Sequence, residues 1–226
     1  MKHTQINISG LVVPALVMLL LSACSLFDLN LQKNYNRKPH PIDSHLYKTT
    51  WDYLKARSTG NNQDTIFKFM YDGIIYCGID TNEYKEAGRT FILLHNDAIK
   101  RIVKNVVQPD CFFGANLVNG KPGTKWSDYP KETVKNYLSY LLLAGEFTHV
   151  KNLSTSDTLV QTLAPRGIYP GNSRSVMGLR ILDASLSNTV DYPIQINDSV
   201  SVRTSDLLST NGVVQVVDRY INPNFQ

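Results

Sequence analysis

The chain has 226 residues, of which 42% are hydrophobic and 19% are charged, so it can bury a substantial core and is not a disordered sequence. Its formal net charge is +4, and the charged residues are scattered. This weak and dispersed charge argues against a nucleic-acid-binding protein.

The N-terminus is built like a bacterial export signal. Positive charge stands at its start, Leu11–Leu21 form an almost wholly apolar run, and the small residues Ser22 and Ala23 precede Cys24. The run is well short of the ~20 residues that span a bilayer as a helix. The segment resembles the lipobox of bacterial lipoproteins, which implies that residues 1–23 are removed and that Cys24 is acylated as the first mature residue. An ordinary signal peptide with a chance cysteine is the alternative.

This resemblance places the protein in the cell envelope of a Gram-negative bacterium, at the outer membrane, with acyl chains as its membrane anchor. Residues 24–45 are polar and interrupted by prolines, which predicts a tether between the lipid and the folded part. The remaining residues, 46–226, are expected to form one domain.

The first half of that domain is interpreted as mostly helical. Capping residues, apolar spacing and glycine stops indicate the boundaries. The expected elements are a helix capped by Thr49 or Thr50, a helix from Asp64 to Gly73, a strand over Arg89–Leu94, a helix from His95 or Asn96 to Val106, and a helix over Lys131–Ala144. Gln108–Pro130, rich in glycine, is expected to be a long insertion loop.

The second half is interpreted as strands. They are expected over Thr158–Leu163, Val176–Leu182, Ile194–Ile196, Val200–Arg203 and Gly212–Val217. Gly212–Val217 is apolar on both faces, which predicts a central strand. Helices followed by strands give an α+β domain, with the strands of the second half in a β-sandwich or wedge.

Three segments resemble the fasciclin domain. Thr90–Ile99 is similar to the first signature of that family, Val134–Leu141 to its central helix, and Asn211–Asp218 with Tyr220–Pro223 to its closing strand. The resemblance implies a single fasciclin-like domain that mediates binding or adhesion.

Two positions depart from the pattern of the family. Leu141 follows Tyr140 where a Tyr-His pair is common, and His95 stands where the family tends to have proline or threonine. The adhesion sites of the family are therefore not transferred to this chain.

No complete catalytic or ligand motif is present in the sequence. The histidines have no partner at the spacing of a zinc site, and no phosphate loop or nucleophile elbow is complete. Asp80 and Glu83 flank Thr81-Asn82 and are expected to support a helix start, whereas a glycosidase would need them to converge in a cleft. We expect a non-catalytic protein without cofactor or metal that binds a surface protein or a glycan. The alternatives are a glycan-processing hydrolase with an unrecognised site and a structural subunit of a surface glycan-uptake assembly.

Aromatic residues gather in or beside the long loops. They are Phe112, Phe113, Trp126, Tyr129 and Tyr169. Exposed rings at these positions would stack on sugars or anchor a protein partner, whereas buried rings would cover the core beneath the loops.

Cys77 and Cys111 remain beyond the lipobox. In an exported protein such a pair forms a disulfide or stays as two buried thiols, and both alternatives stay open.

Overall fold

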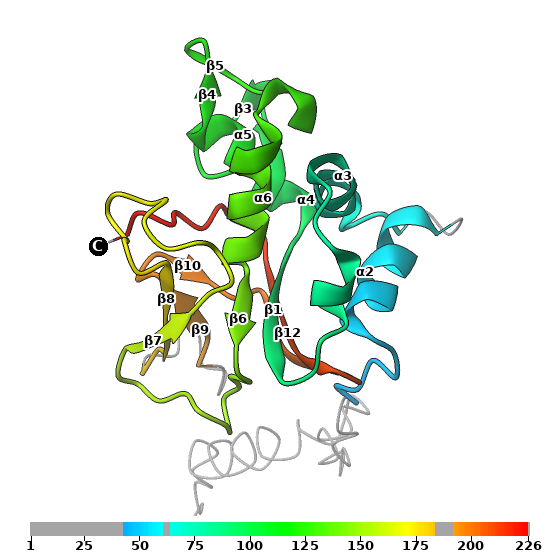
Figure 1. Ribbon diagram of the computed structural model, residues 1–226, viewed down its shortest axis with the longest axis vertical. Coiled ribbons are helices and arrows are strands. Elements are labelled where there is room, and N and C mark those ends of the chain that lie inside the picture. Colours follow the sequence, from blue (N-terminus) through cyan, green and yellow to red (C-terminus); the bar gives the residue numbers. More distant parts are fainter. Residues whose placement is uncertain (1–42, 61–63, 184–191, 226) are drawn as a thin grey trace, which may run out of the picture. The chain divides into compact units, whose positions relative to one another are not determined.

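The computed structural model describes residues 43–60, 64–183 and 192–225 (Figure 1). The predicted export signal, Cys24 and the predicted tether up to residue 42 lie outside the described residues. Asp43–Gln226 form a single unit. No helix within the described ranges is long and apolar enough to cross a membrane.

The helices and 3-10 turns lie mostly in the first half of the chain, as expected. They are α2 (Thr50–Thr59), α3 (Lys68–Cys77), η1 (Thr81–Tyr84), α4 (Asn96–Ile99), α5 (Phe112–Ala115), η2 (Trp126–Asp128) and α6 (Lys131–Tyr140).

The strands belong to two larger sheets and two short hairpins. They are β1 (Arg89–Leu94), β2 (Ile102–Val103), β3 (Val106–Val107), β4 (Leu117–Val118), β5 (Lys121–Pro122), β6 (Leu142–Ala144), β7 (Thr158–Gln161), β8 (Val176–Ile181), β9 (Ile194–Ile196), β10 (Val200–Ser201), β11 (Thr204–Ser209) and β12 (Gly212–Val217).

The first sheet has the strand order β11-β12-β1-β6. β1 and β12 run parallel, from the pair Arg89 and Gly212 to the pair Leu94 and Val217. Every residue of β12 is buried, because a strand in the middle of a covered sheet meets neighbours on both faces. The prediction that Gly212–Val217 is a central strand is confirmed.

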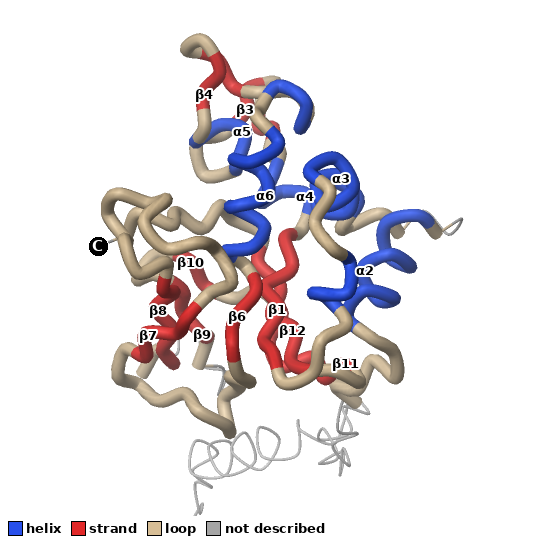
Figure 2. Tube along the Cα trace, in the orientation of Figure 1, coloured by secondary structure: helices blue, strands red, loops and turns tan. Residues whose placement is uncertain are grey.

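The second sheet is antiparallel, with the order β10-β9-β8-β7. Figure 2 shows α2 and α3 to one side of β1 and β12, and β7 to β9 to the other. The two sheets are joined where the Leu163 backbone N–H, just after β7, donates to the carbonyl of Leu142 in β6 at 2.9 Å. The α+β class is therefore confirmed, and the strand β1 from the first half lies inside the first sheet.

The second expected helix has different ends. It begins at Lys68 and continues past Gly73 to Cys77, where Gly78 adopts a left-handed conformation with φ of 68°. Asp64 does not cap this helix and instead pairs with Arg57 at 2.7 Å. Gly73 lies mid-helix because a side chain there would meet the Trp126 ring at 2.8 Å.

The third expected helix is only one turn long. His95 caps it, since its Nδ1 accepts a hydrogen bond from the Asp97 backbone N–H at 3.2 Å. The helix ends at Ile99, and the chain then forms the β2–β3 hairpin, whose turn residues Lys104 and Asn105 have φ of 49° and 64°. The expected helix through Val106 was wrong, since helical apolar spacing also fits a short hairpin.

Two other boundaries differ from the prediction. The helix expected over Lys131–Ala144 ends at Tyr140, because Leu142–Ala144 pair with β1 as strand β6. Strand β11, Thr204–Ser209, was not expected, and it completes the edge of the first sheet next to β12. Leu46 also donates its backbone N–H to the Leu208 carbonyl at 2.8 Å, which joins the start of the domain to this edge.

Candidate functional site

The aromatic residues predicted as partner-binding anchors lie mostly in the core. Phe112, Phe113, Trp126 and Tyr129 are 2%, 1%, 5% and 6% exposed. The Phe112 ring lies 5.0 Å from that of Trp126, and the Trp126 indole N–H donates to the Phe69 carbonyl at 2.7 Å. These rings therefore cover the core beneath the loop and are not exposed anchors. Packing them on one another is favoured because it removes their apolar surface from water.

Tyr169, the fifth predicted anchor, is partly buried. Its ring packs edge-on against Tyr140 with centroids 5.5 Å apart. It belongs to the loop after β7 and is separate from the other four rings in the chain. The structure therefore does not bring the five residues together as one binding surface.

Cys77 and Cys111 are both buried free thiols. The Cys111 thiol donates to the Gln108 carbonyl at 3.1 Å, and the Cys77 thiol to the Ile74 carbonyl at 3.6 Å. Burial raises the pKa of the Cys77 thiol. The structure therefore has the second of the two alternatives, without a disulfide.

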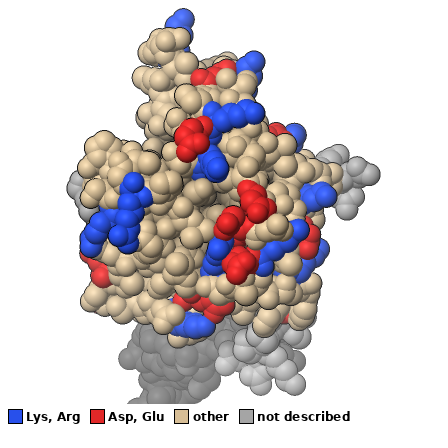
Figure 3. Space-filling view, viewed as in Figure 1, with Lys and Arg blue, Asp and Glu red and all other residues tan. Residues whose placement is uncertain are grey.

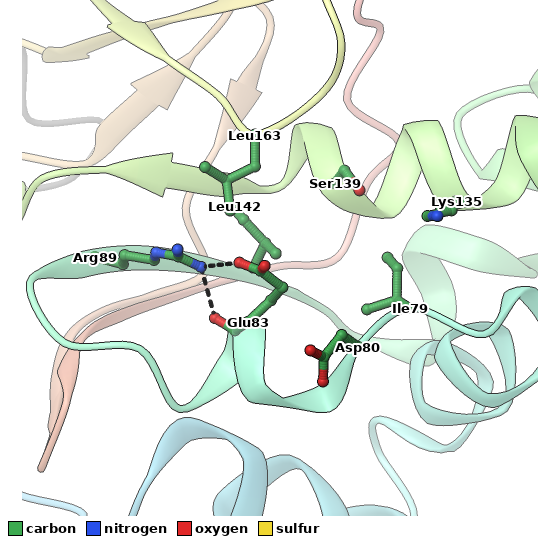
Figure 4. Close-up of a pocket in the computed structure, with 8 residues that line it drawn as sticks. All are labelled: Ile79, Asp80, Glu83, Arg89, Lys135, Ser139, Leu142 and Leu163. Carbon is green, nitrogen blue, oxygen red and sulfur yellow. Dashed lines mark hydrogen bonds and ion pairs between the residues drawn. The ribbon is translucent and has the colours of Figure 1, made fainter.

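A surface pocket of about 390 Å³ lies among η1, β1, α6 and β6 (Figure 4). It combines acidic, basic and aliphatic side chains from segments that are far apart in the sequence. Its lining residues are Ile79, Asp80, Glu83, Arg89, Lys135, Ser139, Leu142 and Leu163. We call it the charged pocket.

An ion pair forms one side of the charged pocket. The Arg89 guanidinium Nη1 contacts the Glu83 carboxylate at 2.5 Å and also donates to the Glu83 backbone carbonyl at 2.9 Å. The sequence places both partners locally, because Glu83 lies in η1 and Arg89 opens β1. The Asp80 carboxylate caps η1 by accepting the Asn82 backbone N–H at 2.9 Å. Each carboxylate of the pocket therefore already interacts with another group of the protein, Glu83 with Arg89 and Asp80 with the backbone of η1.

The other side of the charged pocket carries a cation without such a partner. Lys135 is exposed on α6 and forms no ion pair with any of the described residues. Ser139 lies one helical turn further along the same face. The aliphatic residues that line the pocket are Ile79 and Leu142, which are buried, and Leu163, which is partly exposed.

The charged pocket contains lysine, arginine, carboxylate and hydroxyl side chains. No histidine or cysteine is among its lining residues, and Ser139 and Lys135 lie on one face of α6. In the described part of the chain, no group of three or more His, Cys, Asp or Glu side chains could hold a metal ion. Figure 3 shows acidic and basic side chains close to one another on this face, without a continuous field of one sign.

A second pocket, of about 270 Å³, is lined by aromatic residues. Its lining residues are Phe69, Asp72, Tyr76, Phe113, Thr124, Lys125, Trp126 and Ser127. The Tyr76 hydroxyl donates to the Tyr129 carbonyl at 2.8 Å, and the Lys131 ammonium lies 5.7 Å from the centre of the Tyr76 ring. Phe113 and Trp126, two of the predicted anchors, line this aromatic pocket although they are only 1% and 5% exposed.

Sequence reasoning missed Arg89 and Lys135 as site residues. Arg89 was assigned to a buried strand and Lys135 to the exposed face of a helix. Asp80 and Glu83 carried a signal, because their spacing indicated a helix start. No local pattern predicts that α6 brings Lys135 to the same pocket.

No protein-family model matches the chain, and no curated protein matches it. Among solved structures, the chain is similar to a FAS1 domain pair from the insect cell adhesion molecule fasciclin I. The two are 12% identical, with a TM-score of 0.45, over 69% of this chain and 45% of that one. The chain thus matches less than half the length of that structure.

Proposed function

We propose that this protein is a cell-envelope lipoprotein, anchored at the outer membrane through Cys24, whose fasciclin-like domain binds a partner without catalysing a reaction. The lipobox resemblance of residues 1–24 supports the anchor, and the three fasciclin-like segments support the binding role. The observation that carries the proposal is the charged pocket, in which the Lys135 ammonium forms no ion pair with any described residue and lies in the same pocket as the Glu83–Arg89 ion pair.

A protein segment fits the charged pocket better than a glycan does. None of its lining residues is aromatic, so it lacks the ring faces on which sugars stack. A peptide carboxylate can instead pair with Lys135, while an aliphatic side chain of the peptide covers Leu163, which is partly exposed. Paired charges within a pocket of this kind contribute specificity more than raw affinity.

The positions of the two carboxylates support the non-catalytic proposal. A glycosidase needs one carboxyl group to protonate the leaving group and another to act as base or nucleophile. Glu83 is bound by Arg89 and Asp80 by the η1 backbone, so neither is unpartnered. The alternative, a glycan-processing hydrolase, would require the Glu83–Arg89 pair to open when substrate binds.

The aromatic pocket favours a glycan as the second candidate ligand. The rings of Phe69 and Tyr76 lie there beside the polar groups of Asp72 and Thr124, which is the mixture that recognises sugars. A glycan ligand would suit a structural subunit of a surface glycan-uptake assembly. Trp126 is only 5% exposed, so the more accessible rings of Phe69 and Tyr76 would make the contacts with such a ligand.

The proposal can be tested by reversing the charge of Lys135. The wild-type chain, Lys135→Glu and the control Lys55→Glu would be expressed in the native bacterium, cross-linked in intact envelopes and purified with their partners. Lys55 is exposed on α2 and lines neither pocket, so the control makes the same charge change elsewhere. We expect Lys135→Glu to weaken capture of the protein partner about tenfold, or ~1.4 kcal/mol, and Lys55→Glu to leave it unchanged.

Three outcomes would contradict the proposal. Equal capture by Lys135→Glu and wild type would remove the charged pocket as the binding site. Capture of glycan alone would favour the aromatic pocket. Turnover of a glycan or peptide by the purified chain, abolished by Glu83→Gln, would identify an enzyme.

A further inference from the structure

The β2–β3 hairpin exposes aliphatic side chains on both of its faces. Ile102 pairs with Val107, and Val103 pairs with Val106. Paired residues of a hairpin lie on the same face, so each face carries one of these pairs. Ile102, Val103 and Val106 are 54%, 39% and 60% exposed, so neither face serves mainly to cover the core.

The backbone of this hairpin is well defined. Besides the strand pairing, the Gln108 backbone N–H donates to the Arg101 carbonyl at 2.9 Å. Lys104 and Asn105 form the turn with left-handed backbone angles. The aliphatic side chains are therefore held in an exposed position by a regular hairpin.

Unpaired lysines accompany these aliphatic side chains. Lys100 precedes the hairpin and Lys104 lies at its turn, and neither forms an ion pair with the residues that the structure describes. Arg101, by contrast, is held by Asp110 at 2.8 Å. No acidic residue occurs between Asp97 and Asp110 in the sequence, so the hairpin surface is cationic as well as apolar.

A second hairpin with the same character lies at the same end of the domain. Figure 1 shows β3, β4 and β5 at this end together with α5. In the β4–β5 hairpin, Leu117 is 56% exposed and Lys121 is exposed. Aliphatic and cationic side chains therefore recur at this end on two separate hairpins.

We propose that the β2–β3 hairpin inserts into the headgroup region of an anionic lipid bilayer. A protein partner with a flat surface would cover one face of the hairpin, whereas a bilayer surrounds both faces. Two-residue strands at ~3.4 Å per residue span roughly 7 Å, which matches the ~5–10 Å depth of interfacial binding. Lys100 and Lys104 place ammonium groups where lipid phosphates lie, because lysine extends its charge toward the polar layer. This site is separate from the charged pocket and does not depend on its ligand.

The test uses the full-length chain with Cys24→Ser, which removes the thiol that lipidation would use. Val106→Cys in this chain is labelled with a fluorophore that reports the polarity of its surroundings. The matched control carries the label at Val150→Cys, a position 96% exposed and outside the hairpin. Cys77 and Cys111 are buried and stay unlabelled in the folded protein. Each protein is titrated with vesicles of phosphatidylcholine plus phosphatidylglycerol, with or without brominated acyl chains, and with vesicles of phosphatidylcholine alone.

We expect the label at position 106 to shift to the blue and to be quenched by brominated chains in the anionic vesicles, while the label at 150 does neither. Lys100→Gln with Lys104→Gln should raise the vesicle concentration at half signal roughly 25-fold, at about fivefold for each lysine.

Several results would overturn the proposal. The proposal is wrong if the fluorescence of the label at position 106 does not change with anionic vesicles. It is also wrong if the labels at positions 106 and 150 respond equally. An unchanged titration of the double lysine variant would remove the role of the two ammonium groups. A blue shift that grows with protein concentration in the absence of vesicles would assign the hairpin to a second copy of this chain.

Discussion

Replacing Trp126 with alanine distinguishes a core ring from a surface anchor most sharply. Trp126 is 5% exposed, packs 5.0 Å from the Phe112 ring and donates its indole N–H to the Phe69 carbonyl at 2.7 Å. The substitution removes these contacts and leaves a cavity between the long loop and α3. It also leaves the carbonyl of Phe69 without this donor.

The expected loss of stability follows from these contacts. A buried tryptophan removes about 150–250 Å² from water, worth roughly 4–6 kcal/mol at ~25 cal/mol per Å². The alanine retains part of this burial, and measured Trp→Ala costs in cores are ~3–5 kcal/mol. We therefore expect a loss of about 4 kcal/mol from the free energy of unfolding, compared with a usual total of ~5–15 kcal/mol. For a domain of this size the Tm should fall by roughly 8–16 °C.

Chemical and thermal unfolding of the full chain measure this loss. Ile75→Ala on α3 is the control, because Ile75 is 55% exposed and its truncation should cost less than ~0.5 kcal/mol. If Trp126→Ala unfolds at the same denaturant concentration as wild type, the ring does not belong to the core and the packing described here is wrong.

A second substitution tests the same packing from the opposite side. A Cβ atom on Gly73 would lie 2.8 Å from the Trp126 ring. Gly73→Ala should therefore destabilise the wild type, although alanine is favoured over glycine in a helix by ~0.5–1 kcal/mol. In the Trp126→Ala background the same change should stabilise the protein, because the clash is gone. Additive effects in this double-mutant cycle would contradict the contact.

The remaining predictions concern the cysteines. Cys24→Ala should release the protein from membranes or block its maturation. The intact mass of the wild type should show acylation of Cys24. An unmodified Cys24 in the mature protein would refute the lipid anchor. Cys77 and Cys111 should resist alkylation at about pH 8 in the folded protein and react after denaturation without reductant, because burial raises the pKa of the Cys77 thiol and keeps it protonated. If mass spectrometry finds neither residue alkylated after denaturation, the two form a disulfide.

Continuous apolar runs were enough to predict the two central strands. Arg89–Leu94 and Gly212–Val217 are both dense in aliphatic and aromatic residues, and only a strand with covered faces buries such a run. Their parallel pairing was not predictable from the sequence. Backbone hydrogen bonds are the same for every residue type, so they do not specify which strand lies beside which. The α+β class followed from local patterns, whereas the sheet order came from tertiary structure.

Helix boundaries show where local rules give way to packing. A glycine after apolar residues predicts a helix end, but Gly73 continues the helix because Trp126, distant in the sequence, occupies the space beside it. The apolar residues of Ala98–Val106 have helical spacing, yet only Ala98 and Ile99 are buried in the core. The chain therefore leaves the helix and forms the β2–β3 hairpin. Tertiary contacts outweighed helix propensity at both places, because propensity differences amount to about 1 kcal/mol or less per residue.

The sequence by itself determined the class of fold and its most buried strands, since each depends on residues that are adjacent in the chain. Only the tertiary structure decided which loop aromatics are buried and which charges meet. Exposure depends on what packs over a residue, and Lys135 reaches the pocket of Glu83 and Arg89 only because α6 lies beside η1 and β1.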